Sequence, residues 1–385
     1  MTTVIAIIMI LEIGNLTLYM KQTLPIDCVL AITYHCNSRC TMCDIWKMTD
    51  FTELPASEFA KLPSSLRDIN LSGGEPFLRT DLAEIVKVLV KACPNARIVI
   101  SSNGFATDLI LHRMKDVLKI KPDIGVAISI DGIGEMHNEL RGIPGGFDRA
   151  IKTVKELQKM GMTNLRLAYT LMEKNVTHLS KVYDLSRELG VEFTHSFAQS
   201  SEFYFGGKDN VGNVPRKELM TKEYKNLIKN ELRSWNIKRW LRAYFAFGMY
   251  QFVIKKKQLL DNAPGRDFFF MDPAGNIYPS VVHNVVLENI NNVIPTEAEC
   301  VIPAKAGFLS CIIDKDPSFR RDDSKKQDDS FEKFWQSDTT EKLREKADTM
   351  KIPVWMICTA RTAIKNHPFR VGWWILKNKF FMSSP

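Results

Sequence analysis

PIDCVLAITYHCNSRCTMC, residues 25–43, is the stretch that decides the fold, because it joins a buried strand to three clustered cysteines. Residues 26–33 are apolar or β-branched apart from Asp27, which predicts a strand. Cys36, Cys40 and Cys43 follow at spacings of four and three residues. Three thiolates on one short loop can each bind one iron of a four-iron cubane, and the fourth iron is then left without a protein ligand.

A structural zinc site is the alternative interpretation of these cysteines. Such sites usually close with four ligands in paired spacings. No second pair of cysteines or histidines lies nearby in the sequence. The number of ligands therefore favours an iron–sulfur cluster with one open coordination position.

Strand patterns alternate with amphipathic helix patterns from about residue 25 to residue 232. The predicted strands cover residues 26–33, 67–71, 97–101, 124–130, 164–170 and 191–197. The predicted helices between them cover residues 81–92, 108–119, 147–160 and 176–189, and Gly161 and Gly190 stand at expected helix ends. Repeated strand–helix alternation is typical of a parallel sheet with crossover helices. We predict an α/β fold, a partial (βα)6 TIM-like barrel with a smaller C-terminal α+β extension.

Unusual residues collect after the predicted strands. The first strand is followed by the cysteines, the second by SGGEP, the third by SNG and the fourth by DG. In parallel α/β barrels the chemistry lies on the loops at the C-terminal ends of the strands. We therefore expect one site at one barrel mouth. His195 and Phe197 on the last strand are candidates to face the substrate, although a hydrogen-bonded structural histidine is the alternative for His195.

The run CNSRCTMC resembles the CxxxCxxC signature of the radical S-adenosylmethionine (SAM) superfamily, and SGGEP, residues 72–76, resembles the SAM-binding motif of that family. The resemblance covers about residues 25–232. It implies reductive cleavage of SAM at one [4Fe–4S] cluster to a 5′-deoxyadenosyl radical, which abstracts hydrogen from an unidentified substrate, either a peptide or a lipid- or carbohydrate-linked molecule. It also implies a protein reductant such as a flavodoxin or ferredoxin.

The same resemblance assigns a role to each motif residue. Cys36, Cys40 and Cys43 become the cluster ligands. Met42 stands where the family usually has an aromatic residue against the adenine, and it still offers a backbone carbonyl and an apolar face.

The other assigned residues come from the loops at the predicted barrel mouth and bind SAM: Gly73, Gly74, Glu75, Asn103, Ser129 and Arg141. The first three receive the SAM amino group, Ser129 lies near the ribose, and Arg141 is a partner for the SAM carboxylate. The structural alternatives are turn formation by the glycines, a solvated carboxylate at Glu75 and a satisfied strand end at Ser129.

Four segments follow from these patterns: an N-terminal extension at 1–24, the core barrel at 25–232, a SPASM/twitch-like module at 233–360 with an irregular insertion at about 292–329, and a basic aromatic tail at 361–385. The apolar N-terminus has no basic leader or cleavage site, so it is not interpreted as a signal peptide.

The C-terminal module resembles the SPASM/twitch pattern but lacks most of its cysteines. The expected positions read Asn262, Ser280 and Val354, and only Cys358 remains. Such side chains do not replace thiolates as cluster ligands. Cys300 and Cys311, in the insertion, are interpreted as free thiols, so one cluster is expected. A non-catalytic iron–sulfur protein or a decayed radical SAM homologue is the alternative function.

Composition describes a globular protein, with 45% hydrophobic and 25% charged residues and a net charge of +8. Eight cysteines are too few for a disulfide scaffold, and their clustering indicates a reducing, cytoplasmic location. Residues 351–385 contain six basic and no acidic residues, interleaved with aromatic ones. Two interpretations of this tail stay open, a docked terminal helix and a peripheral membrane contact. Nucleic acid is not an expected partner, because no binding motif accompanies the charge.

Overall fold

The computed structural model describes residues 24–293 and 330–381 of the chain. The predictions for residues 1–23, for most of the insertion, and for Cys300 and Cys311 lie outside these ranges.

One nine-stranded sheet forms the framework, in the order β6-β5-β4-β3-β2-β1-β7-β8-β9. Strands β1 to β7 pair in parallel, and β8 and β9 continue the sheet antiparallel. Their bounds are β1 Asp27–Thr33, β2 Asp68–Gly73, β3 Arg97–Ser102, β4 Gly125–Ser129, β5 Leu165–Leu171, β6 Glu192–Phe197, β7 Phe268–Met271, β8 Asn276–Tyr278 and β9 Glu288–Asn289. The predicted α/β architecture and its first six strands are confirmed.

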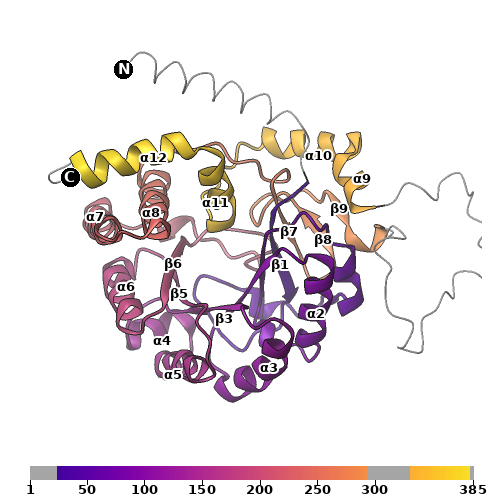
Figure 1. The fold of residues 1–385 in the computed structure, drawn as a ribbon, viewed down its shortest axis with the longest axis horizontal. Coiled ribbons are helices and arrows are strands. Elements are labelled where there is room, and N and C mark those ends of the chain that lie inside the picture. The colour runs from indigo at the N-terminus through magenta and orange to yellow at the C-terminus, as the bar shows by residue number, and fades with distance from the viewer. Residues whose placement is uncertain (1–23, 294–329, 382–385) are drawn as a thin grey trace, which may run out of the picture.

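Helices cover the outer side of the curved sheet between successive strands (Figure 1). They are α2 Leu82–Ala92, α3 Thr107–Ile120, α4 Glu135–Arg141, α5 Gly146–Lys159 and α6 Leu179–Glu188. In α2 the buried residues Leu82, Ile85, Val86 and Leu89 recur every three or four positions, which is the apolar stripe of a helix on a sheet. Helices α5 and α6 end just before glycines with positive φ, as predicted for positions 161 and 190.

The strands of the barrel alternate between an apolar outer face and a polar inner face. In β5 the side chains of Leu165, Leu167 and Leu171 are buried against the helices, whereas Arg166 and Thr170 line an interior cavity. This period of two follows from the pleat of the strand. It directs small and polar residues towards one space inside the barrel.

The C-terminal half is joined to the core through β1. The register pairs Cys28 of β1 with Phe269 of β7, and a hairpin of β7 and β8 follows, with Gly275 in its turn at a φ of 90°. The remaining helices are α7 Lys217–Arg233, α8 Ile237–Lys255, α9 Phe331–Gln336, α10 Asp338–Thr349, α11 Ile357–Asn366 and α12 Pro368–Leu376, followed by a π-helical turn Lys377–Phe381. Helices α9 and α10 are separated at Ser337, whose side chain accepts a hydrogen bond from the amide of Thr340 and caps α10.

The tail packs on the barrel through α12. Trp374 stacks on Phe247 of α8 with ring centroids 4.9 Å apart, and Val371 and Ile375 are buried. The tail therefore docks on the barrel through α12, as one of its two interpretations expects. No helix within the described ranges is both long enough and apolar enough to cross a membrane.

Candidate active site

The three clustered cysteines border a cavity of about 290 Å³ inside the barrel. Cys36, Cys40 and Cys43 are each partly exposed, and all three line this cavity. Their loop follows β1 and is held by α4, since the amide of Arg39 donates to the carbonyl of Arg141 at 3.0 Å and that of Thr41 to Leu140 at 2.8 Å. The backbone at the end of α4 thus holds the middle of the loop in place.

The donor set around these sulfurs suits an iron–sulfur cluster. Ser38 Oγ lies 3.1 Å from Cys40 Sγ, and Arg141 Nη1 donates to the same sulfur at 3.7 Å. Burial raises the pKa of Cys36 and Cys43 to about 12, so a bound cation has to supply the charge that keeps them as thiolates. Within the described residues, no three histidine, cysteine or acidic side chains lie close enough together to bind one metal ion jointly. A cubane does not require that grouping, because each thiolate binds a different iron.

The SGGEP loop lies directly against the cysteine loop. The amide of Gly74 donates to Thr33 O, and the amide of Glu75 to His35 O, both at 2.8 Å. A Cβ at Gly73 would lie 2.2 Å from Thr33 O, and one at Gly74 would lie 2.2 Å from His35 O. Gly73 also has a φ of 111°, which side-chain-bearing residues rarely adopt. Both glycines are therefore needed for the two loops to meet.

Glu75 braces two neighbouring loops. Its carboxylate is fully buried and accepts hydrogen bonds from Phe77 N, from Ser102 Oγ and from Asn103 N. Burial raises the pKa of Glu75 to about 7, while these donors oppose that shift. The structure therefore gives the Glu75 side chain a positioning role, so that any contact with a ligand at this position falls to the backbone of the loop.

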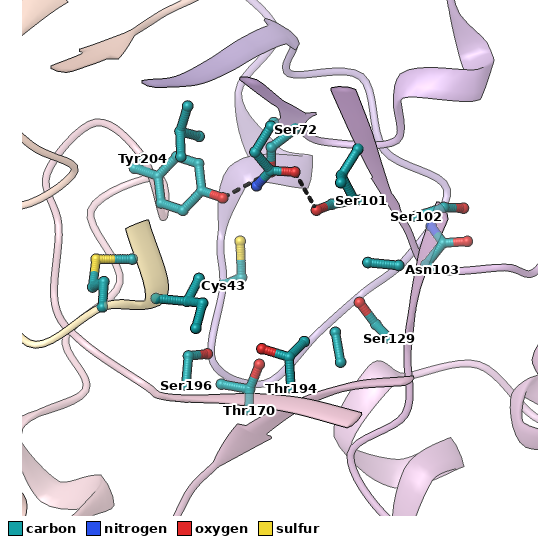
Figure 2. Close-up of a pocket in the computed structure, with 18 of the residues that line it drawn as sticks. Cys43, Ser72, Ser101, Ser102, Asn103, Ser129, Thr170, Thr194, Ser196 and Tyr204 are labelled. Atoms are coloured by element: carbon teal, nitrogen blue, oxygen red, sulfur yellow. Dashed lines mark hydrogen bonds between the residues drawn. The ribbon is translucent and has the colours of Figure 1, made fainter. Parts of the chain in front are cut away.

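Asn103 and Ser129 end neighbouring strands at the cavity (Figure 2). Asn103 Nδ2 donates to Asn37 Oδ1 of the cysteine loop at 2.6 Å, and its Oδ1 accepts from the amide of Phe105. Ser129 is the partly exposed last residue of β4. The structure thus brings both residues to the mouth where the sequence analysis expects them.

Arg141 lines the cavity but already has a carboxylate partner. Its Nε lies 2.6 Å from Asp131 Oδ2, and Asp131 Oδ1 accepts from Thr170 N. Burial raises the pKa of Asp131, and the Arg141 charge opposes this. Arg141 therefore links β5, α4 and the cysteine loop, and the predicted SAM carboxylate has to share this guanidinium with Asp131.

Met42 forms part of the cavity wall. It is 5% exposed and packs with Leu140 and Met172. Its carbonyl oxygen accepts a hydrogen bond from Asn210 Nδ2 at 3.0 Å. The apolar face expected at this position is present, and the predicted contact with adenine stays a prediction.

The last strand differs from expectation. Thr194 and Ser196 surround the cavity in Figure 2, whereas the ring of His195 lies among Phe193, Tyr224 and Phe245. Phe197 packs against the outer hydrophobic core. The ring of His195 is buried among aromatic side chains, yet the residue also borders the cavity and its Nε2 has no hydrogen-bond partner, so the structure does not show the hydrogen-bonded histidine of the alternative interpretation.

Sequence reasoning missed several lining residues that come from distant segments. Tyr204 Oη lies 2.8 Å from Ser72 Oγ, and Gly206 packs against the backbone of Asp44. Cys358 and Arg361 reach the cavity from α11. The small hydroxyl residues at every second strand position were the available signal for the polar interior.

Two of the expected cysteine positions of the C-terminal module lie together. Asn262 Nδ2 donates to the carbonyl of Val354 at 2.5 Å. Ser280 Oγ lies 2.8 Å from His283 Nδ1, and Cys358 is buried. A hydrogen bond thus joins the segments of Asn262 and Val354, whereas the bond of Ser280 is local.

Comparisons with known proteins point to one family. Residues 30–185 match the Radical SAM superfamily. The sporulation killing factor maturation protein SkfB of Bacillus subtilis (strain 168) is 29% identical over 173 residues, which cover 43% of this chain and 41% of SkfB. The pre-heme d1 synthase of Dinoroseobacter shibae is 33% identical over 193 residues, 47% of this chain and 45% of that protein. The matched stretches thus span less than half of each of these two relatives.

The fold has a solved counterpart over nearly its whole length. Native anSMEcpe with bound AdoMet and Cp18Cys peptide superimposes with a TM-score of 0.54 at 14% identity, covering 91% of this chain and 99% of that chain. At this identity the likeness concerns the fold alone.

Proposed function

We propose that this chain, whose residues 30–185 match the Radical SAM superfamily, is an enzyme of that family that reductively cleaves SAM and removes hydrogen from a substrate. One observation carries the proposal: the three cysteines and the Gly73–Gly74 turn border the same cavity, with their loops in backbone contact. When bound, a reduced [4Fe–4S] cluster and SAM together supply a carbon-centred radical for hydrogen abstraction.

The residues of the chain have distinct tasks in this proposal. Cys36, Cys40 and Cys43 hold the cluster, and the open backbone at Gly73 and Gly74 admits the SAM amino group. Asn103, Ser129 and Arg141 orient the rest of SAM by hydrogen bonds, while Met42 lies along its adenine. The barrel and α11 exclude water from the cavity, which protects a reactive species from side reactions.

Partners follow from the same chemistry. A one-electron donor such as a flavodoxin or ferredoxin reduces the cluster, and a reducing compartment, the cytoplasm, keeps it intact. The substrate is a peptide or a lipid- or carbohydrate-linked molecule. SkfB is named as a maturation protein and the other relative as a pre-heme d1 synthase, so relatives of this chain are named for different products.

A non-catalytic iron–sulfur protein, or a decayed homologue, is the second candidate. Asn262, Ser280 and Val354 favour it, because they stand where the C-terminal pattern has cysteines. The same residues support the proposal of a single cluster. An intact SAM site distinguishes the two candidates, since a simple electron carrier has no use for one.

The test is anaerobic reconstitution of the full chain with iron and sulfide, followed by a reductant and SAM. We expect the wild type to form 5′-deoxyadenosine and to hold about four irons, as one cubane requires. Cys40→Ala should lose both product and iron. Cys93→Ala, a buried cysteine outside the loop, is the matched control and should retain both.

Equal product from the wild type and Cys40→Ala would sink the enzymatic proposal. A wild type that holds the cluster yet forms no product would favour the non-catalytic candidate. An iron content of about eight atoms per chain would contradict the proposal of a single cluster.

A further inference from the structure

The strands around the cavity carry smaller and more polar side chains than a filled barrel interior does. Barrel interiors of this kind are commonly filled by bulky Val, Ile and Leu side chains. Here the inward positions in the middle and at the C-terminal ends of β2 to β6 are mostly small or polar, with Val99 as the bulky apolar exception: Asn70, Ser72, Ser101, Ala127, Ser129, Ala168, Thr170, Thr194 and Ser196. Figure 2 shows the labelled serines and threonines around one open space. Such a wall leaves room for a ligand and offers it hydrogen bonds.

The cavity continues from the cysteine loop to the N-terminal ends of the strands. Asp68 is the first residue of β2, Arg97 the first of β3 and Arg166 the second of β5, and all three line it. Arg361 of α11 lines the same region. Thr170 stands four positions after Arg166 along β5, which places the two levels about 13 Å apart.

Most charges at this lower end already have partners. Asp68 lies within 2.8 Å of both Arg97 and Arg361, and within 3.4 Å of Lys365. Asp27 pairs with Arg361 at 2.9 Å. Asp27 and Asp68 are therefore already neutralised by ion pairs with neighbouring cations.

Arg166 differs from these cations. No described carboxylate forms an ion pair with it, and its Nη2 donates to Asn164 Oδ1 at 2.8 Å while its buried Nε has no hydrogen-bond partner. Its register neighbour Glu192 is paired with Arg242 at 3.4 Å. Burial lowers the pKa of Arg166, and the charges of Arg361, Arg242 and Arg97 add to that effect, while Glu192 opposes it. The half-buried guanidinium of Arg166 thus lies near other positive charges and has no carboxylate of its own. An anion bound there would neutralise it.

We infer that Arg166 binds an oxyanion, a carboxylate or a phosphate, at the end of the substrate that lies farthest from the cysteine loop. The planar guanidinium matches the geometry of either group. The hydroxyl-bearing wall then lies along the polar middle of that substrate. The role as a substrate site rests on the proposed function, whereas the anion site itself does not.

Equilibrium dialysis of the full reconstituted chain tests the site, with labelled inorganic phosphate and labelled succinate as separate probes. The wild type should bind at least one of them, and the stronger probe identifies the class of oxyanion. Arg166→Gln should weaken binding roughly 10- to 100-fold, because a hydrogen-bonded charge is lost. Arg166→Lys, which keeps the charge, should retain part of the affinity and guards against a variant that fails to fold.

Arg149→Gln is the matched control, because Arg149 is exposed on α5 away from the cavity, and it should bind like the wild type. Undiminished binding by Arg166→Gln, or no binding of either probe by the wild type, would overturn the site. SAM cleavage by the wild type is assayed separately. Anion binding without SAM cleavage would remove the proposed function and leave the anion site standing.

Discussion

At the scale of single residues, the barrel wall buries ionisable groups that folding holds in their neutral form. His195 is 5% exposed and enclosed by Phe193, Tyr224 and Phe245. Burial lowers the pKa of His195 from 6.5 to about 3. Its ring thus contributes to packing as an aromatic side chain, at the cost of a dependence on pH.

The sign of that dependence gives a prediction for His195→Phe. Below pH 6.5 His195 becomes protonated in the unfolded chain but stays neutral in the folded chain. The free energy of unfolding therefore falls progressively towards pH 3. At pH 5 the loss from this one residue is about 2 kcal/mol, at 1.36 kcal/mol for each pH unit. His195→Phe should remove it, so that urea unfolding at pH 7.5 and pH 5 differs less than in the wild type. His112→Phe, at an exposed position, should change nothing, and an equal acid sensitivity of His195→Phe would contradict the assignment.

At the scale of elements, helix α11 is tied to the starts of two central strands. Arg361 bridges Asp27 of β1 and Asp68 of β2 at 2.9 and 2.8 Å. Burial raises the pKa of Asp27 to about 7, while Arg361 opposes that shift. The helix thus closes the lower end of the cavity through charges that are largely removed from water.

Arg361→Ala should therefore be costly. Removing Arg361 leaves the buried Asp27 without its cation, whereas Asp68 keeps Arg97 and Lys365, and we expect a loss of about 3 kcal/mol in the free energy of unfolding. Asp27→Asn in the Arg361→Ala background should recover part of that loss. Arg370→Ala, at an exposed position of α12, is the control, and chemical denaturation measures all four proteins. A loss no larger than that of the control would show that α11 does not depend on this bridge.

The same scale shows how far the sequence predicts this protein. The six core strands were predictable because each has an apolar outer face, and the cysteine and SGGEP loops because they follow such strands. Tyr204 was not, because the segment around it has no period and its place depends on a contact with Ser72. Arg361 was not, since its partner Asp68 lies 293 residues away in the sequence. The orientation of the His195 ring, which packs among aromatic side chains while the residue borders the cavity, was not predictable because β6 has polar residues on both faces.

At the scale of the whole molecule, one surface gathers most of the exposed apolar side chains. Seven of the eleven large hydrophobic residues exposed in the described chain lie here: Trp235, Ile237, Leu241, Phe369, Trp373, Leu376 and Phe380. Lys379 lies over the rings of Trp235 and Trp240, which joins the tail to the corner between α7 and α8. Arg233, Lys238, Arg370 and Lys377 are exposed nearby along the same elements. Figure 1 shows α12 beside α7 and α8.

We propose that this aromatic–basic face contacts an anionic lipid surface. Aromatic residues with surrounding bases suit the membrane interface. The full chain should sediment with vesicles that contain phosphatidylserine, and less so as salt rises. Trp373→Ser should weaken binding, whereas Val211→Ser, exposed elsewhere, should not. Equal binding to neutral vesicles would contradict a role for charge, and an unaffected Trp373→Ser would contradict this face.

The central position of β1 has a consequence for how the chain is made. The strand that leads into the cysteines has β2 on one edge and β7 on the other, and the β7 partner of Cys28 is Phe269. During synthesis that second edge stays unpaired until more than 240 further residues have left the ribosome. An open strand edge recruits other chains, and distant pairings form slowly. We therefore expect the chain to aggregate more readily when its synthesis stops before β7 than when it is complete.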